Sequence, residues 1–89
     1  MSVGHKIRAI RDLRSMTQKE LGIKAGFSAA TADVRIRQYE SHKMIPKEDK
    51  LKEIATALDV DVSALKDYDI YSDLNLMQIL FELEKIMDW

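Results

Sequence analysis

The chain has 89 residues, which fits one small domain, and its formal net charge of −1 looks low for a nucleic-acid-binding protein. It contains no cysteine, which excludes disulfide bonds and cysteine-ligated zinc sites. No apolar run approaches the roughly 20 residues of a membrane span and no signal peptide opens the chain, so we expect a cytoplasmic protein without a membrane partner.

Glycine and proline are scarce, with three copies and one copy respectively. Because β-type alternation is scarce too, the sequence predicts an all-α fold of helices joined by short turns. A first helix is predicted over about residues 2–14, where Val3, Ile7 and Ile10 mark the buried stripe.

A short second helix, predicted over about residues 18–25, carries the clearest local signals. Thr17 and Glu20 have the spacing of a capping box, in which each side chain bonds the backbone N–H of the other residue. Gly26 can adopt the left-handed conformation that ends a helix. Gly22 lies inside the helix, where glycine costs roughly 0.5–1 kcal/mol relative to alanine, so we expect close contact with a neighbouring helix there.

Four further helices are predicted after this one. The third covers about residues 32–41, and Pro46 suits the first turn of the fourth. A short fifth helix is capped by Asp61 or Ser63, and a sixth covers about residues 73–87. The fourth helix has an amphipathic stripe of Leu51, Ile54, Ala55 and Leu58.

Charge is distributed unevenly along the chain. Residues 1–43 hold nine Lys or Arg and four Asp or Glu, a net charge of +5. Residues 44–89 hold five bases and eleven acids, a net charge of −6. The basic half contains the second and third predicted helices, which together form a helix-turn-helix. A basic surface on such a motif favours contact with phosphates.

Residues 6–65 resemble the helix-turn-helix domain of the XRE family, the Cro and phage-repressor class. The matching segments are Ile7 to Arg11, Thr17 to Leu21, Gly26 to Ser28, Tyr39 with Glu40, Pro46, and Leu58 to Val60. The resemblance implies a five-helix lambda-repressor-like domain, over residues 1–66, that binds operator DNA as a dimer. It also implies a transcription regulator, most simply a repressor of prophage or mobile-element type. Residues 67–89 would add a C-terminal helix.

The turn between the second and third helices departs from the family pattern. About four residues, 29–32, are extra between Ser28 and Glu40. Either the turn is longer and Thr31 caps the third helix, or Ser28 caps a recognition helix lengthened by about one turn. We favour the cap at Thr31.

The third helix carries the residues expected to read DNA bases. If Ile36 faces the core, Ala32 and Tyr39 complete the buried stripe, and the opposite face centres on Val34 and Gln38. On this face, Gln38 can bond adenine and Val34 can meet a thymine methyl group. Arg35 or Arg37, which flank these two residues, can bond guanine. The alternative is that the arginines touch only phosphates. The predicted DNA-binding residues are Thr17, Gln18, Lys19, Thr31, Val34, Arg35, Arg37, Gln38 and Lys43.

Two further roles concern the DNA backbone and the fold. The resemblance places Gln18 at a position that contacts the DNA backbone, and Lys19 and Lys43 can add phosphate contacts. It also implies that Arg11 and Glu40 form a partly buried salt bridge between the first and third helices. That bridge would be structural rather than functional.

The predicted C-terminal helix has two apolar faces, of which one suffices for docking onto a small domain. A second apolar face favours a partner, so we expect a homodimer, although both faces could pack within one chain. Residues 66–89 hold two lysines and six acids, a net charge of −4, which favours a position away from DNA. The predicted dimer contacts are Leu76, Met77, Leu80, Phe81 and Leu83.

The alternative function is an antitoxin-type or other protein-interaction module that uses the acidic C-terminal helix. We do not expect an enzyme, because the carboxylates occupy exposed or capping positions without a nucleophile–base pair or a phosphate-binding glycine loop. The spacing of His5 and His42 does not suggest a metal site. We therefore expect double-stranded DNA as the partner, without a metal, cofactor or small-molecule site.

Overall fold

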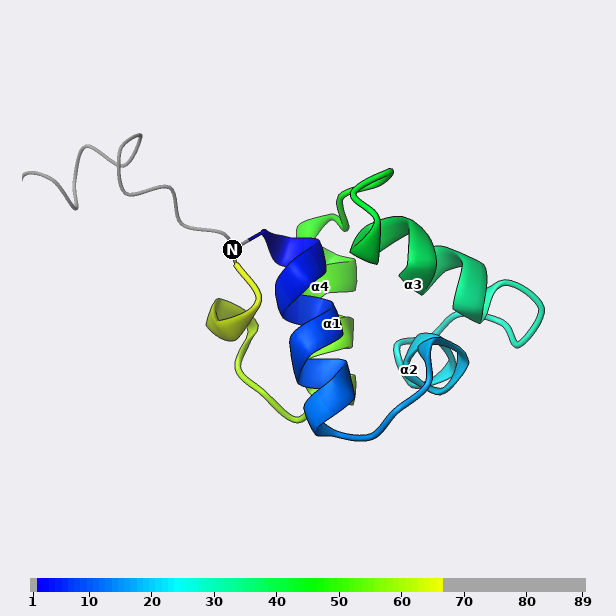
Figure 1. Cartoon of the computed structure of the whole chain (residues 1–89), viewed down its shortest axis with the longest axis horizontal. Helices are drawn as coiled ribbons and strands as arrows, with labels where there is room; N and C mark the ends of the chain where they lie inside the picture. Colours follow the sequence, from blue (N-terminus) through cyan, green and yellow to red (C-terminus); the bar gives the residue numbers. More distant parts are fainter. Residues whose placement is uncertain (1, 67–89) are drawn as a thin grey trace, which may run out of the picture.

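The computed structural model describes residues 2–66, and within that range it is all-helical, as the sequence predicts. The helices are α1 (Val3–Leu13), α2 (Gln18–Lys24), α3 (Ala32–Glu40) and α4 (Glu48–Ala57), followed by a 3₁₀ turn, η1 (Val62–Ala64). Helix α3 contacts both α1 and α2, and α4 contacts α2 and η1. The turn between α2 and α3 projects from the body of the domain (Figure 1).

The expected five-helix count is not reached in this part of the chain. The described residues hold four α-helices, and the fifth predicted helix is the single 3₁₀ turn η1. Asp61 caps this turn, because its carboxylate accepts a bond from the Ser63 N–H at 3.0 Å. The predicted sixth helix and its apolar faces lie outside the described residues.

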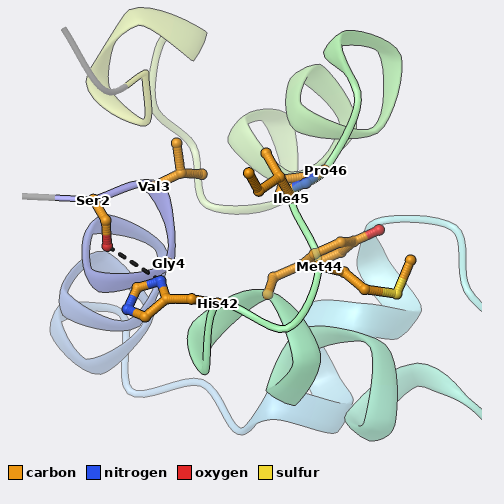
Figure 2. A pocket seen from close by; sticks show the side chains of 8 residues that line it. Ser2, Val3, Gly4, His42, Met44, Ile45 and Pro46 are labelled. Atoms are coloured by element: carbon orange, nitrogen blue, oxygen red, sulfur yellow. Dashed lines mark hydrogen bonds between the residues drawn. The ribbon is translucent and has the colours of Figure 1, made fainter. Parts of the chain in front are cut away.

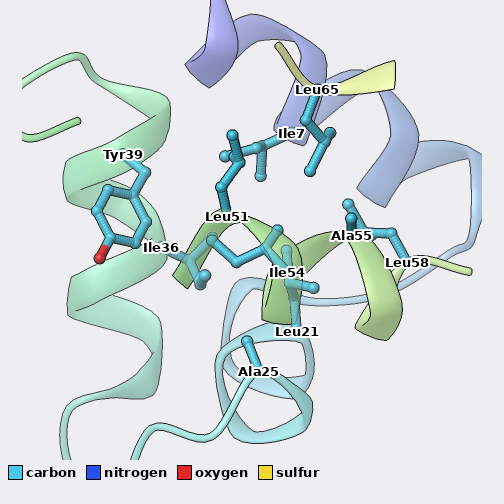
Figure 3. Close-up of a cluster of buried hydrophobic side chains, with 10 residues drawn as sticks. All are labelled: Ile7, Leu21, Ala25, Ile36, Tyr39, Leu51, Ile54, Ala55, Leu58 and Leu65. Atoms are coloured by element: carbon cyan, nitrogen blue, oxygen red, sulfur yellow. The ribbon is translucent and has the colours of Figure 1, made fainter. Parts of the chain in front are cut away.

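The core receives side chains from all four α-helices. Figure 3 shows Ile7, Leu21, Ile36 and Ile54 converging from α1, α2, α3 and α4 respectively, and each is fully buried. Leu65, just after η1, closes the cluster. The predicted apolar stripe of the fourth helix is confirmed, since Leu51, Ile54, Ala55 and Leu58 are all buried.

The two ends of α2 are formed as the sequence predicts, with one difference. The Thr17 hydroxyl accepts a bond from the Glu20 N–H at 3.0 Å, and Gly26 ends the helix with a φ of +98°. The Glu20 carboxylate does not complete a reciprocal capping box. It accepts a bond from the Thr17 hydroxyl at 3.1 Å, so the two side chains bond each other.

Gly22 sets the distance between α2 and α3. A Cβ atom at this position would lie 2.5 Å from the Ala32 carbonyl oxygen and 2.7 Å from the Ala32 Cβ. The two helices therefore cross in direct backbone contact, which confirms the close approach expected there. This crossing fixes the first turn of α3 against α2.

The favoured start of the third helix is confirmed, since α3 begins at Ala32 with Thr31 as its N-cap residue, but two local details at the other helix starts differ from the sequence prediction. Thr31 occupies the residue before α3, but its hydroxyl makes no cap bond and instead lies 3.0 Å from the Ser28 hydroxyl. The physical reason is that Thr31 has a φ of −120° and a ψ of −6°, whereas a capping side chain needs an extended backbone. Pro46 is not in the first turn of α4, because Lys47 is the N-cap and Pro46 is the buried residue before it.

Candidate nucleic-acid interface

Helix α3 separates a buried face from an exposed one. Ala32, Ile36 and Tyr39 are buried, which confirms the predicted inner stripe. The expected outer face includes Val34, which is 42% exposed although it is apolar, and Arg35, which is exposed. An exposed apolar side chain beside arginines is the combination that base edges and phosphates of DNA can both contact.

Gln38 is less exposed than predicted for a residue at the centre of that face. Its side chain is only half-exposed, and its Oε1 atom is buried without a hydrogen-bond partner among the described residues. The chain folds back at this point, since the Met44 N–H and the Ser41 hydroxyl both donate to the Gln38 carbonyl oxygen. Helical periodicity alone does not predict this, because it takes no account of the chain that follows the helix.

The arginines of α3 differ in their surroundings. The Arg37 guanidinium lies 3.4 Å from the Asp33 carboxylate, one turn earlier on the same exposed surface. This exposed pair contributes little to stability, but it offsets the negative charge that Asp33 would otherwise present to phosphates. Arg35 is exposed without a salt bridge to the described residues.

A polar cavity of about 280 Å³ lies where α1, the start of α2 and the end of α3 meet. Its lining consists of Arg8, Arg11, Gln18, Arg37, Glu40 and Ser41. Three arginines against one carboxylate leave this cavity net positive. Sequence reasoning named Gln18 and Arg37 separately and omitted Arg8 from the site. The sequence does contain a signal for Arg8, because Arg8 and Arg11 are three residues apart and therefore lie on the same side of α1.

A chain of hydrogen bonds connects the three helices inside this cavity. Arg11 Nε donates to Glu40 Oε2 at 2.7 Å, and Arg11 Nη2 donates to Glu40 Oε1 at 3.0 Å. Gln18 Nε2 donates to the same Oε1 atom at 3.2 Å. The hydrogen bond from Arg11 to Glu40 raises the pKa of Arg11 above its usual value, so the guanidinium stays charged. Glu40 therefore orients Gln18 as well as holding Arg11.

The enlarged turn between α2 and α3 forms a second exposed part of the candidate interface. The Ser28 carbonyl oxygen accepts bonds from the Thr31 N–H at 3.1 Å and the Ala32 N–H at 2.9 Å, which makes residues 28–31 one ordered turn. Ser28 and Thr31 are both exposed. Figure 1 shows this turn extending beyond the first turn of α3. Thr31 is thus separated from the cavity that contains Gln18.

The remaining predicted residues are distributed over the surface. Thr17 caps α2 and is exposed, Lys19 is exposed in the first turn of α2, and Lys43 is exposed in the turn after α3. The predicted dimer contacts lie in residues 67–89, outside the described part of the chain, and stay a prediction. Between residues 2 and 66 there is no group of three or more His, Cys, Asp or Glu that could hold a metal ion.

None of the helices formed by residues 2–66 has the length and apolar character needed to span a membrane. A family model described as "Helix-turn-helix", HTH_3, matches residues 7–65 of the 89. That match covers all of α2, α3, α4 and η1 and most of α1. A search of curated proteins gives no match.

Proposed function

This chain belongs to the helix-turn-helix family of XRE and Cro-like DNA-binding regulators, and we propose that it is a repressor that binds a palindromic operator as a dimer. The observation that carries the proposal is the position of α3. This helix is fixed by the Gly22 crossing and the Arg11–Glu40 pair, and it exposes Val34 and Arg35 outward.

Contacts to the DNA backbone come from the cavity and its surroundings. Gln18 Nε2 donates one of its two hydrogens to Glu40, which leaves the second hydrogen and the arginines at the cavity rim to donate to a phosphate. Arg8 and Arg37 supply positive charge on either side, and Lys19 and Lys43 add exposed ammonium groups. Such contacts position a protein on the duplex without reading its sequence.

Base reading belongs to the outer face of α3. Arg35 or Arg37 bonds guanine, Val34 meets a thymine methyl group, and Gln38 bonds adenine after its side chain turns outward. That rotation would also give the unpartnered Oε1 atom a partner, so the free protein does not lose a bond when Gln38 binds a base. Thr31, at the edge of the enlarged turn, contacts the sugar–phosphate backbone beside the base-reading residues.

Dimerisation through residues 67–89 completes the proposal. The apolar residues of that segment that we propose as dimer contacts are Leu76, Met77, Leu80, Phe81 and Leu83. Residues 66–89 have a net charge of −4, which supports a position away from the phosphates. Two copies of α3 would then read half-sites about one turn of DNA apart.

Selection of bound sites from random duplex DNA, at a fixed salt concentration, tests the proposal directly. We expect an enriched palindrome, and we expect Arg35→Ala to lose the preference at one base pair of each half-site. Lys52→Ala, on the exposed surface of α4, is the matched control and should select the same palindrome. Equal affinity for every duplex would overturn sequence-specific regulation, and would leave the antitoxin-type interaction module as the better hypothesis.

A further inference from the structure

Two histidines that are far apart in the sequence meet at the first turn of α1. His5 lies in that turn, and His42 lies in the segment between α3 and α4. Their ring centroids are 4.8 Å apart and the ring planes make an angle of 76°, an edge-to-face arrangement. The spacing of these two histidines in the sequence does not suggest a metal site, but tertiary folding brings the rings together.

The Ser2 hydroxyl marks the point on which both rings converge. Ser2 Oγ lies 3.1 Å from His5 Nδ1 and 3.4 Å from His42 Nδ1, and Figure 2 shows the second of these contacts. A hydroxyl carries one proton, so it can donate to only one of the two Nδ1 atoms, and the other ring must donate to it. Two imidazole nitrogens are therefore directed at a single oxygen position.

The backbone holds His42 in this place. Its φ of +66° is in the left-handed region, which few non-glycine residues adopt, and its N–H donates to the Tyr39 carbonyl oxygen at 3.2 Å. Gly4 makes room for the ring, because a Cβ atom there would lie 3.0 Å from His42 Nδ1 and Cε1. The position of this ring thus depends on specific local structure and not only on the freedom of an exposed side chain.

We propose that His5 and His42 bind a divalent transition-metal ion through their Nδ1 atoms, with Ser2 Oγ beside it. Neutral imidazole is a ligand that suits zinc, copper and nickel, at about 2.0–2.1 Å for zinc. Small rotations of the two exposed rings bring their Nδ1 atoms from the hydroxyl onto the ion, and in the ring that donates to Ser2 the proton moves from Nδ1 to Nε2. Water completes the coordination, because no carboxylate of residues 2–66 joins the two histidines in a metal-binding group.

Such an ion would connect the start of α1 to the segment that follows α3. It binds only when the fold brings the two rings together, so it stabilises the folded state by mass action. This inference concerns residues other than the proposed DNA contacts and does not depend on the proposed function.

Zn²⁺ titration of the full-length, tag-free protein, followed by calorimetry at neutral pH, tests the site. We expect one ion per chain, and at least tenfold weaker binding for His5→Ala and for His42→Gly. Glycine is chosen at position 42 because it adopts the left-handed backbone without strain. Lys52→Ala, on the exposed surface of α4, is the control and should bind Zn²⁺ as the unchanged protein does.

Two further readouts keep the proposal falsifiable if a variant unfolds. Zn²⁺ should raise the melting temperature of the unchanged protein and of Lys52→Ala, but not that of His5→Ala. The ¹⁵N chemical shifts of the rings should show that zinc is bound at Nδ1 of both histidines. Equal affinity in the unchanged protein and both histidine variants, or coordination through Nε2, would overturn the assignment.

Discussion

Arg11 and Glu40 join α1 to the end of α3 through two parallel hydrogen bonds, from Nε at 2.7 Å and from Nη2 at 3.0 Å. Their side chains are only 12% and 6% exposed, so this is a largely buried ion pair. Arg11 also donates to the Met16 carbonyl oxygen at 2.9 Å, which ties the link between α1 and α2 to the same guanidinium. One side chain therefore connects the three helices of the candidate interface.

Arg11→Ala should lower the free energy of unfolding by about 3 kcal/mol, because it leaves the Glu40 carboxylate buried without its cation. Urea unfolding followed by circular dichroism measures this change. Arg8→Ala is the matched control on the same helix, and should change the free energy by less than about 0.5 kcal/mol because Arg8 is exposed. Equal stability of the two variants would show that the ion pair is not a structural clamp.

Gly22→Ala should destabilise the domain although alanine is the better helix former. Helix propensity alone would stabilise this variant by about 1 kcal/mol. The added Cβ, however, would meet the backbone of Ala32 at 2.5 Å, and a backbone atom cannot move aside as a flexible side chain can. We expect a lower melting temperature and weaker DNA binding, since the start of α3 must shift. A melting temperature equal to or above that of Lys24→Ala, an exposed control on α2, would contradict the close crossing.

How far the sequence predicts this fold depends on the range of the interactions involved. Several signals within one turn of helix are confirmed, as the Thr17 cap, the left-handed Gly26 and the buried stripe around Ile54 show. Each depends on one residue type or on residues close together in the sequence, which a single sequence displays directly.

Features that depend on how distant segments of the chain pack together could not be predicted from the sequence alone. Gln38 is placed on an outer face by helical periodicity, but the chain after α3 returns against its carbonyl oxygen. Thr31 has the residue type of a cap, but the backbone of the enlarged turn does not let its hydroxyl reach the helix. His5 and His42 meet only through tertiary packing. Contacts between residues far apart in the sequence can be predicted only when the fold is known. A family resemblance provides that knowledge only for the segments that follow the family pattern.

The two glutamines of the interface should respond differently to removal of their amides. Gln38→Leu removes a buried, unpartnered oxygen, whose burial typically costs about 1–3 kcal/mol, so stability should stay equal or rise. Gln18→Leu removes a bond to Glu40 and should lower stability. Both variants should bind operator DNA more weakly. Urea unfolding and a duplex titration measure these effects, and a Gln38→Leu protein less stable than Gln18→Leu would show that Gln38 supports the fold.

Lys43→Ala should weaken binding to all duplexes by a similar factor, because an ammonium group on a phosphate contributes affinity without sequence discrimination. Measured against salt concentration, the slope of the logarithm of affinity should become shallower by about one unit, the loss of one phosphate contact. Lys52→Ala removes an equal charge from α4, which supplies no residue of the candidate interface, so its salt slope should stay unchanged. A Lys43→Ala protein that discriminates less between the operator and an unrelated duplex, with an unchanged salt slope, would instead assign Lys43 to base reading.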